Sequence, residues 1–279
     1  MIKVVTATLA LGFFVSTASL AHAACAALPG PCEIDEGTYH IALPEGEGPF
    51  PALVFLHGAG GSGEASIRGI LRAVERGYAV IGPDGLPRPE NNRRSWSFHP
   101  SFEPRRDEAA FLGAVIDDAA IQHRIDRTSV LIGGFSIGGS MATYLACDHP
   151  DLAAAFVPVA GSFWRPHPEL DDCVGPVRLF HTHGWRDGTV PLEGRPIRNG
   201  EVLQGDVFYA MQVWRATNGC NGLKATQFET NAAFWRRSWP DCDAGALEFV
   251  LYPGGHGVPD GWTDMVLDWF EALATPPRE

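Results

Sequence analysis

Residues 130–140, VLIGGFSIGGS, limit most strongly what this chain can fold into. An apolar, β-branched run ends at two glycines, a serine follows, and two more glycines come directly after it. A strand that turns this abruptly into a helix needs glycines around its central residue, because a Cβ there would collide with a neighbouring strand or helix. The segment therefore predicts a buried strand, a tight turn at Ser136, and a helix over residues 140–148.

Apolar runs of strand length alternate with segments of helical period along the chain. Strands are predicted at residues 51–56, 78–81, 129–132, 155–159, 177–181 and 247–251. Helices are predicted at residues 107–122 and 262–273, where apolar side chains share one face, and near residues 206–216. This order predicts an α/β fold in one domain, with a mostly parallel central sheet and helices on both faces. Two stretches do not follow the pattern, and we expect them to form loops over one edge of the sheet: residues 86–104 and 195–242.

The N-terminus has the pattern of a secretory signal peptide. A short basic start precedes the almost wholly apolar residues 4–20, and Ala21-His22-Ala23 fits the small-x-small cleavage pattern. We predict a signal peptide at residues 1–23, one domain at residues 24–279, and a secreted or periplasmic location. A membrane anchor is the alternative, but the apolar run is short for a span.

All six cysteines follow the predicted cleavage site, and their number is even. In an oxidising compartment this favours three disulfides, for which fifteen pairings are open. Order and spacing favour the pairs Cys25–Cys32, Cys147–Cys173 and Cys220–Cys242. The formal net charge of −12 argues against nucleic acid or an anionic membrane surface as a partner and favours neutral substrates.

Residues 134–138 form the G-x-S-x-G pattern of a nucleophile elbow, between a predicted strand and a predicted helix. A serine nucleophile needs a base, which a third group must orient. Asp187 and His256 follow the last two predicted strands, in the chain order Ser, acid, His that this arrangement requires. Asp84, Asp241 and Asp260 follow the wrong strand or none. A glycine-rich turn with an incidental serine is the alternative.

Two backbone N–H groups are candidates for an oxyanion hole. The Ile137 N–H lies at the predicted helix start, and the Ala59 N–H, with Gly60 next, lies in the loop after the first predicted strand. His57 is expected to brace that loop. Its GAGGSG run lacks the acidic residue of a dinucleotide site.

Two further groups of side chains are candidates for binding. His181 and His183 have the spacing of a metal-binding pair, with His167 nearby, but no carboxylate or cysteine complements them, so we expect neither metal nor cofactor. Aromatic residues on predicted loops are candidates for pocket walls, with Arg93 and Arg94 near the rim and loop packing as the alternative; the substrate-binding candidates are Trp96, Trp164 and Trp185.

These motifs resemble the α/β-hydrolase esterases similar to polyhydroxybutyrate depolymerases and to feruloyl or acetylxylan esterases. The similarity spans nearly the whole mature chain and rests on FLHGAGGSG (55–63), the elbow region (126–161), HGWRDGTVPLEGRPI (183–197), WRATNGC (214–220) and YPGGHG (252–257). The resemblance implies a serine esterase with a catalytic triad, formed by Ser136, Asp187 and His256, that acts on a small-molecule or oligomeric ester.

The sequence departs from true poly(hydroxyalkanoate) depolymerases at two places. Those enzymes carry His-Gly-Cys and Ser-x-Asn, where this chain has His57-Gly58-Ala59 and Ser136-Ile137-Gly138. A soluble ester is therefore expected rather than the solid polymer. Two other classes remain open: a secreted serine peptidase of the same fold, and a catalytically inactive hydrolase fold that serves as a binding module.

Overall fold

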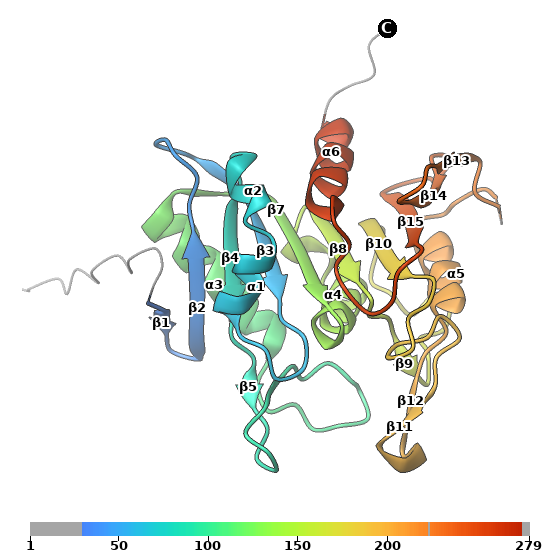
Figure 1. Cartoon of the computed structure of the whole chain (residues 1–279), viewed down its shortest axis with the longest axis horizontal. Coiled ribbons are helices and arrows are strands. Elements are labelled where there is room, and N and C mark those ends of the chain that lie inside the picture. The colour runs from blue at the N-terminus through green and yellow to red at the C-terminus, as the bar shows by residue number, and fades with distance from the viewer. Residues whose placement is uncertain (1–29, 223, 275–279) are drawn as a thin grey trace, which may run out of the picture.

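The computed structural model describes residues 30–222 and 224–274. Ten strands of this part form one sheet in the order β1-β2-β4-β3-β7-β8-β10-β15-β14-β13 (Figure 1). The strands are β1 (Cys32–Ile34), β2 (Gly37–Ala42), β3 (Phe50–Leu56), β4 (Ala79–Pro83), β7 (Ile125–Phe135), β8 (Ala155–Val159), β10 (Arg178–Gly184), β13 (Gln227–Thr230), β14 (Trp235–Trp239) and β15 (Ala246–Tyr252). The six from β4 to β15 in this order run parallel, and the outer pairings β1–β2, β2–β4, β15–β14 and β14–β13 are antiparallel.

Helices cover both faces of the sheet, as predicted. One buried apolar cluster contains side chains of α3, α4 and α5, and a second contains side chains of α1, α2 and α6. The helices are α1 (Gly63–Gly69), α2 (Arg72–Glu75), α3 (Glu108–His123), α4 (Ile137–Asp148), α5 (Val207–Thr217) and α6 (Trp262–Ala274), with 3₁₀ turns η1 (Pro150–Leu152) and η2 (Arg198–Gly200). Short strands form two small sheets: β5 (Leu86–Pro87) with β6 (Arg94–Ser95), and β12 (Val202–Gln204) between β9 (Trp164–Arg165) and β11 (Pro196–Ile197).

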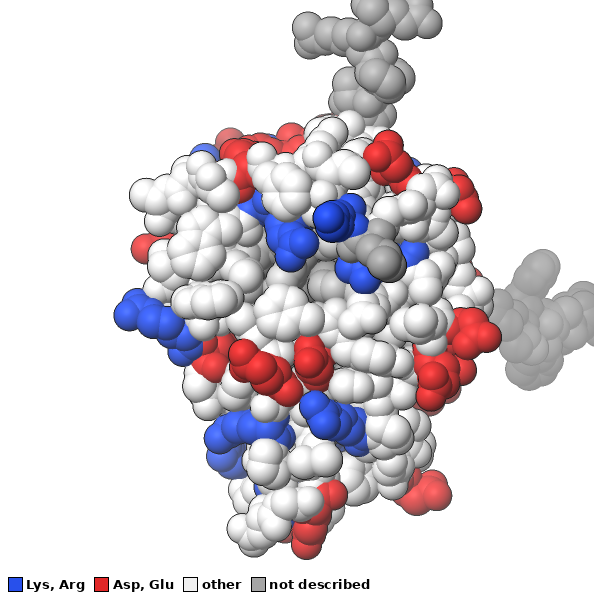
Figure 2. Space-filling model, turned by 90° about the vertical axis from the view of Figure 1, so that its right-hand side faces the viewer, with Lys and Arg blue, Asp and Glu red and all other residues white. Residues whose placement is uncertain are grey.

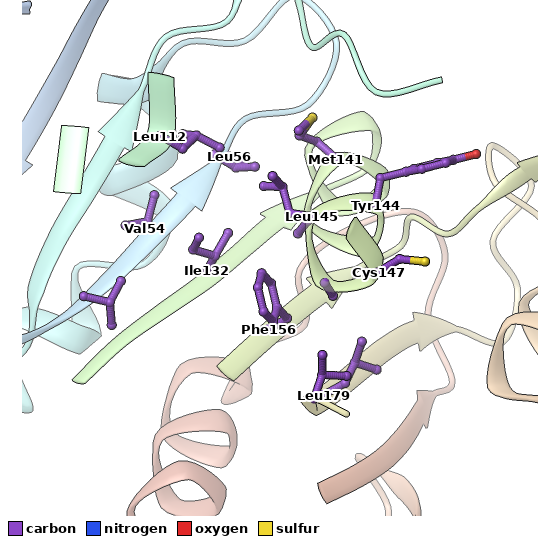
Figure 3. Close-up of a cluster of buried hydrophobic side chains, with 14 of the residues drawn as sticks. Val54, Leu56, Leu112, Ile132, Met141, Tyr144, Leu145, Cys147, Phe156 and Leu179 are labelled. Carbon is purple, nitrogen blue, oxygen red and sulfur yellow. The ribbon is translucent and has the colours of Figure 1, made fainter. Parts of the chain in front are cut away.

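Helix α4, which begins directly after Ser136, is held tightly against the sheet. Every residue from Ile137 to Cys147 is buried. Figure 3 shows Met141 and Leu145 of this helix among apolar side chains of the strands beneath it. Burying a side chain of this size contributes about 1.5–3 kcal/mol, so the helix gives the preceding turn a rigid support.

The six predicted strands are the six parallel strands, but the prediction for residues 195–242 was wrong in part. Strands β14 and β13 extend the main sheet beyond β15, with Trp235 opposite Leu251. All four residues of β13 are exposed, so this strand lacks the alternation of apolar and polar residues that marks a half-buried strand. Residues 86–104 contain only the two-residue strands β5 and β6.

Two of the three predicted disulfides are present, Cys147–Cys173 and Cys220–Cys242. The first joins the last turn of α4 to the segment before β10. Cys25 and the predicted signal peptide lie outside the described residues. Within the described ranges, the longest apolar helix falls short of what a membrane span requires.

Candidate active site

Ser136 lies in the sharp turn between β7 and α4 with φ 59° and ψ −121°, a conformation that L-residues rarely adopt. Such strain costs on the order of 1–3 kcal/mol and persists only where the surroundings enforce it. A Cβ on Gly138 would overlap the Leu56 carbonyl oxygen of β3, and one on Gly134 would overlap the backbone of Gly138. The close approach of strand, turn and helix therefore explains both glycines of the G-x-S-x-G pattern.

The structure brings the three predicted triad residues together, although they lie far apart in sequence. His256 Nε2 is 2.9 Å from Ser136 Oγ, and His256 Nδ1 is 2.7 Å from Asp187 Oδ2. Ser136 follows β7, Asp187 follows β10 and His256 follows β15, so all three are at the carboxyl ends of parallel strands. This geometry can deprotonate the serine hydroxyl while the carboxylate holds the imidazole.

The Asp187 carboxylate is buried, and both of its oxygens have hydrogen-bond partners. Its Oδ1 accepts hydrogen bonds from the backbone N–H groups of Thr189 (2.9 Å) and Val190 (2.8 Å), while Oδ2 faces His256. Burial works against ionisation, but the hydrogen bonds from His256 and from the two N–H groups outweigh it and keep the pKa of Asp187 below its usual value. A charged carboxylate is therefore held in place to orient the histidine.

His181 and His183, which have the spacing of a metal-binding pair, form a buried support behind Asp187. His183 Nε2 is 2.8 Å from the Val190 carbonyl oxygen, 3.5 Å from Asp187 Oδ2, and its Nδ1 is 3.1 Å from His181 Nε2. Burial lowers the pKa of both imidazoles, so they are neutral at pH 7. His167 stacks on Tyr209 instead and accepts a hydrogen bond from the Asp206 N–H. Sequence reasoning missed this support, although His183 stands four residues before Asp187.

The loop that carries Ala59 is braced by His57. The His57 Nδ1 lies 2.8 Å from the Gly58 carbonyl oxygen, its Nε2 accepts a hydrogen bond from the Gly85 N–H, and its own carbonyl accepts one from the Trp96 indole. Burial lowers the pKa of His57. In the described part of the chain, no protein group accepts a hydrogen bond from the Ala59 or Ile137 N–H. Both N–H groups therefore remain candidate oxyanion donors.

Asp84, one of the other carboxylates considered for the triad, has a different role. It accepts hydrogen bonds from the Gly63 N–H at the start of α1 and from the Thr38 hydroxyl.

Two cavities reach the residues of the elbow. A groove of about 550 Å³ contains Ser136, His256 and Ala59 and has largely apolar walls that include Ile70 and Val258. A second cavity of about 410 Å³ reaches Ile137. The groove is therefore the space in which a group can meet the serine hydroxyl.

The three tryptophans considered as pocket walls differ in position. Trp96 and Trp164 line the second cavity and are buried. Trp185 is 55% exposed, packs edge-on against Trp235, and lines neither cavity.

Comparison with known proteins assigns the chain to a family. Residues 51–196 match the alpha/beta hydrolase fold family, and the chain belongs to it. A protein named as an esterase, NocK of Nocardia uniformis subsp. tsuyamanensis, is 34% identical over 55% of this chain, but the match spans only 44% of that protein. Feruloyl esterase C of Emericella nidulans is 24% identical over 82% of this chain and 80% of its own length.

Among solved structures, an acetyl xylan esterase from Aspergillus awamori superposes with a TM-score of 0.61 at 17% identity, over 85% of this chain and 94% of that one. At this identity the likeness shows a shared fold. Together with the family match and the esterase relatives, it defines the class of this protein: a carboxylic ester hydrolase of the alpha/beta hydrolase fold family.

Proposed function

We propose that this protein is a serine esterase in which Ser136 is the nucleophile, His256 the general base and Asp187 the residue that orients His256. The observation that carries this proposal is the continuous hydrogen-bonded path from Ser136 Oγ through His256 to Asp187, at 2.9 and 2.7 Å. Serine hydroxyls at these distances are activated by the imidazole in acyl-transfer enzymes on several unrelated folds.

In the proposed mechanism Ser136 Oγ attacks the ester carbonyl carbon while His256 Nε2 takes the hydroxyl proton. The N–H groups of Ile137 and Ala59 bind the oxyanion of the tetrahedral intermediate. His256 then gives its proton to the leaving alcohol, and an acyl-enzyme forms on Ser136. Water attacks this acyl group in the same geometry, with His256 again the base, and the free acid leaves.

The substrate class that we propose is a soluble ester of the feruloyl, acetyl-polysaccharide or hydroxyalkanoate-oligomer type. The names of the feruloyl and acetyl xylan esterases support it. We also propose removal of residues 1–23, a catalytic domain at 24–279 and export to the periplasm or medium; the two disulfides support an oxidising compartment.

The test is intact-mass spectrometry after reaction with a fluorophosphonate probe. We expect one adduct on the wild type, none on Ser136→Ala, and slow labelling of His256→Ala. Turnover of an ester should exceed that of the amide of the same acyl group, whereas a peptidase would cleave both. A folded, disulfide-intact wild type that takes up no probe would contradict the proposal and favour a binding module.

A further inference from the structure

The second cavity, of about 410 Å³, combines aromatic walls with arginine side chains that converge from three segments. Phe98, Phe102 and Trp164 supply apolar surface, and Phe98 and Trp164 meet edge to face at 5.0 Å. The cavity also reaches Ile137, whose N–H is the proposed oxyanion donor. Because Ile137 is the residue next to Ser136, one substrate molecule could place its ester carbonyl at Ser136 and another part of itself in this cavity.

Three arginines line this cavity: Arg88, Arg105 and Arg198. Among the described residues, none of the three has a carboxylate within 4.0 Å, whereas other arginines of the chain, such as Arg106 and Arg236, form ion pairs. Burial lowers the pKa of Arg88, and the positive charge of Arg198 lowers it further. Three positive charges thus line one cavity, with Arg88 partly buried and Arg105 and Arg198 exposed, and no carboxylate of the described residues is in contact with them.

The three guanidinium groups differ in how far the protein already uses them. Arg105 donates to the backbone carbonyls of Leu86, Pro87 and Ser95 and is committed to bracing the β5–β6 turn. Arg88 donates to the Ser95 hydroxyl, and within the described ranges its other guanidinium N–H groups have no hydrogen-bond acceptor. Arg198 lies over the Phe102 ring at 5.4 Å from its centre. Arg88 and Arg198 therefore have donors to offer a ligand.

Among the acidic groups around the cavity, Glu90 offsets part of the positive charge at Arg88 without forming an ion pair with it. Glu90 and Glu103 line the cavity, but both are exposed and neither pairs with the three arginines. His99 is kept neutral by burial, which lowers its pKa. Figure 2 shows that Lys or Arg and Asp or Glu side chains both occur on the face of the molecule at the right-hand side of Figure 1, without one large patch of a single sign.

We propose that this arginine cavity binds a carboxylate on one half of the ester substrate, while the apolar groove at Ser136 holds the other, uncharged half. The inference rests on the proposed esterase function and specifies its substrate class as anionic esters. A guanidinium matches a carboxylate with two parallel hydrogen bonds, and the aromatic walls suit a ring or short chain that carries it. The overall negative charge of the protein favours neutral substrates, but the groups lining this cavity set the local preference.

The test measures binding by calorimetry with the Ser136→Ala variant, which would hold the intact ester. Two matched pairs place the charge on either half: 4-(butyryloxy)benzoate against its methyl ester, and monomethyl adipate against dimethyl adipate. We expect the anionic member of at least one pair to bind about tenfold more tightly, the effect of one charge-assisted hydrogen bond. Adding Arg88→Gln or Arg198→Gln should remove this preference and leave the neutral ester unchanged.

The control is Arg178→Gln, the same change of charge at the exposed first residue of β10, away from the carboxyl ends of the strands. Equal affinity within both pairs, or an equal loss with the control variant, would overturn the inference. Because binding is measured without turnover, the result is separable from the fluorophosphonate test. A carboxylate preference with no labelling of Ser136 would leave the cavity assignment intact and refute the esterase function.

Discussion

Replacing Asp187 by asparagine should remove the base function of His256 while leaving the fold intact. The backbone N–H groups of Thr189 and Val190 both donate to Oδ1 of the carboxylate. Only the amide oxygen of an asparagine can take that position, so its NH₂ group must face His256 Nδ1. That nitrogen then becomes an acceptor, the ring proton moves to Nε2, and the nitrogen next to Ser136 can no longer accept the hydroxyl proton.

The expected loss in kcat is about 10⁴-fold, the size known for a histidine held in the wrong tautomer, which corresponds to about 5.5 kcal/mol of barrier. The loss of folding stability should be smaller, about 2 kcal/mol, because two hydrogen bonds from backbone N–H groups change from a charged to a neutral acceptor. Turnover of a p-nitrophenyl ester measures the first quantity, and urea unfolding measures the second. ¹⁵N NMR of labelled histidine reports directly on the tautomer of His256.

Asp126→Asn is the matched control, because this aspartate lies at the start of β7 and its carboxylate, among residues 30–222 and 224–274, bonds only to its neighbours Thr128 and Ser129. It should leave turnover within about twofold. A folded Asp187→Asn protein that loses less than tenfold in kcat, or whose His256 keeps its proton on Nδ1, would refute the reasoning.

Two further predictions concern stability. Gly138→Ala should lower the free energy of unfolding, measured with urea, by about 3 kcal/mol or more, because the new Cβ would overlap the Leu56 carbonyl oxygen. Gly69 is the last residue of α1, and a Cβ added there would meet no neighbouring atom within 4 Å, so Gly69→Ala should leave the free energy of unfolding unchanged or raise it by up to about 1 kcal/mol. Equal effects would contradict the close approach. Burial lowers the pKa of His181 in the folded protein. Below about pH 6.5 the unfolded chain therefore binds a proton at His181 that the folded protein does not bind, and the free energy of unfolding decreases as the pH is lowered. His181→Leu should reduce the slope of unfolding free energy between pH 6 and 5 by up to about 1.4 kcal/mol per unit; an unchanged slope would count against a neutral His181.

The core of the fold and the triad geometry could be predicted because each leaves a local signal. A parallel strand buried on both faces is a continuous apolar run, as in β8, and the elbow glycines report a steric demand within five residues. The edge strands could not be predicted in this way. The residues of β13 are solvated on both sides, so their pairing with β14 depends on the neighbouring strand rather than on their own pattern.

The proposed carboxylate-binding cavity could not be predicted from the sequence. Arg88 and Arg198 are 110 positions apart and belong to irregular segments, so only the folded chain brings both to one cavity. Their neighbours carry no spacing that predicts a binding site. The prediction of Trp96 and Trp164 near a pocket rests on aromatic type and position on predicted loops, and the same argument gives Trp185, which lines neither cavity.

The proposed triad and the cavity arginines differ in predictability because they lie on different parts of the fold. Ser136, Asp187 and His256 each follow a strand of the parallel sheet, and Gly138 cannot accept a Cβ without moving β3 away from α4. The arginines lie on turns whose side chains point into solvent-accessible space, where substitution disturbs little packing. In the proposed mechanism, substitutions at the arginines would change which ester is selected without changing how it is cleaved. The arginine variants should therefore alter binding preference, whereas the elbow and Asp187 variants should alter stability or kcat.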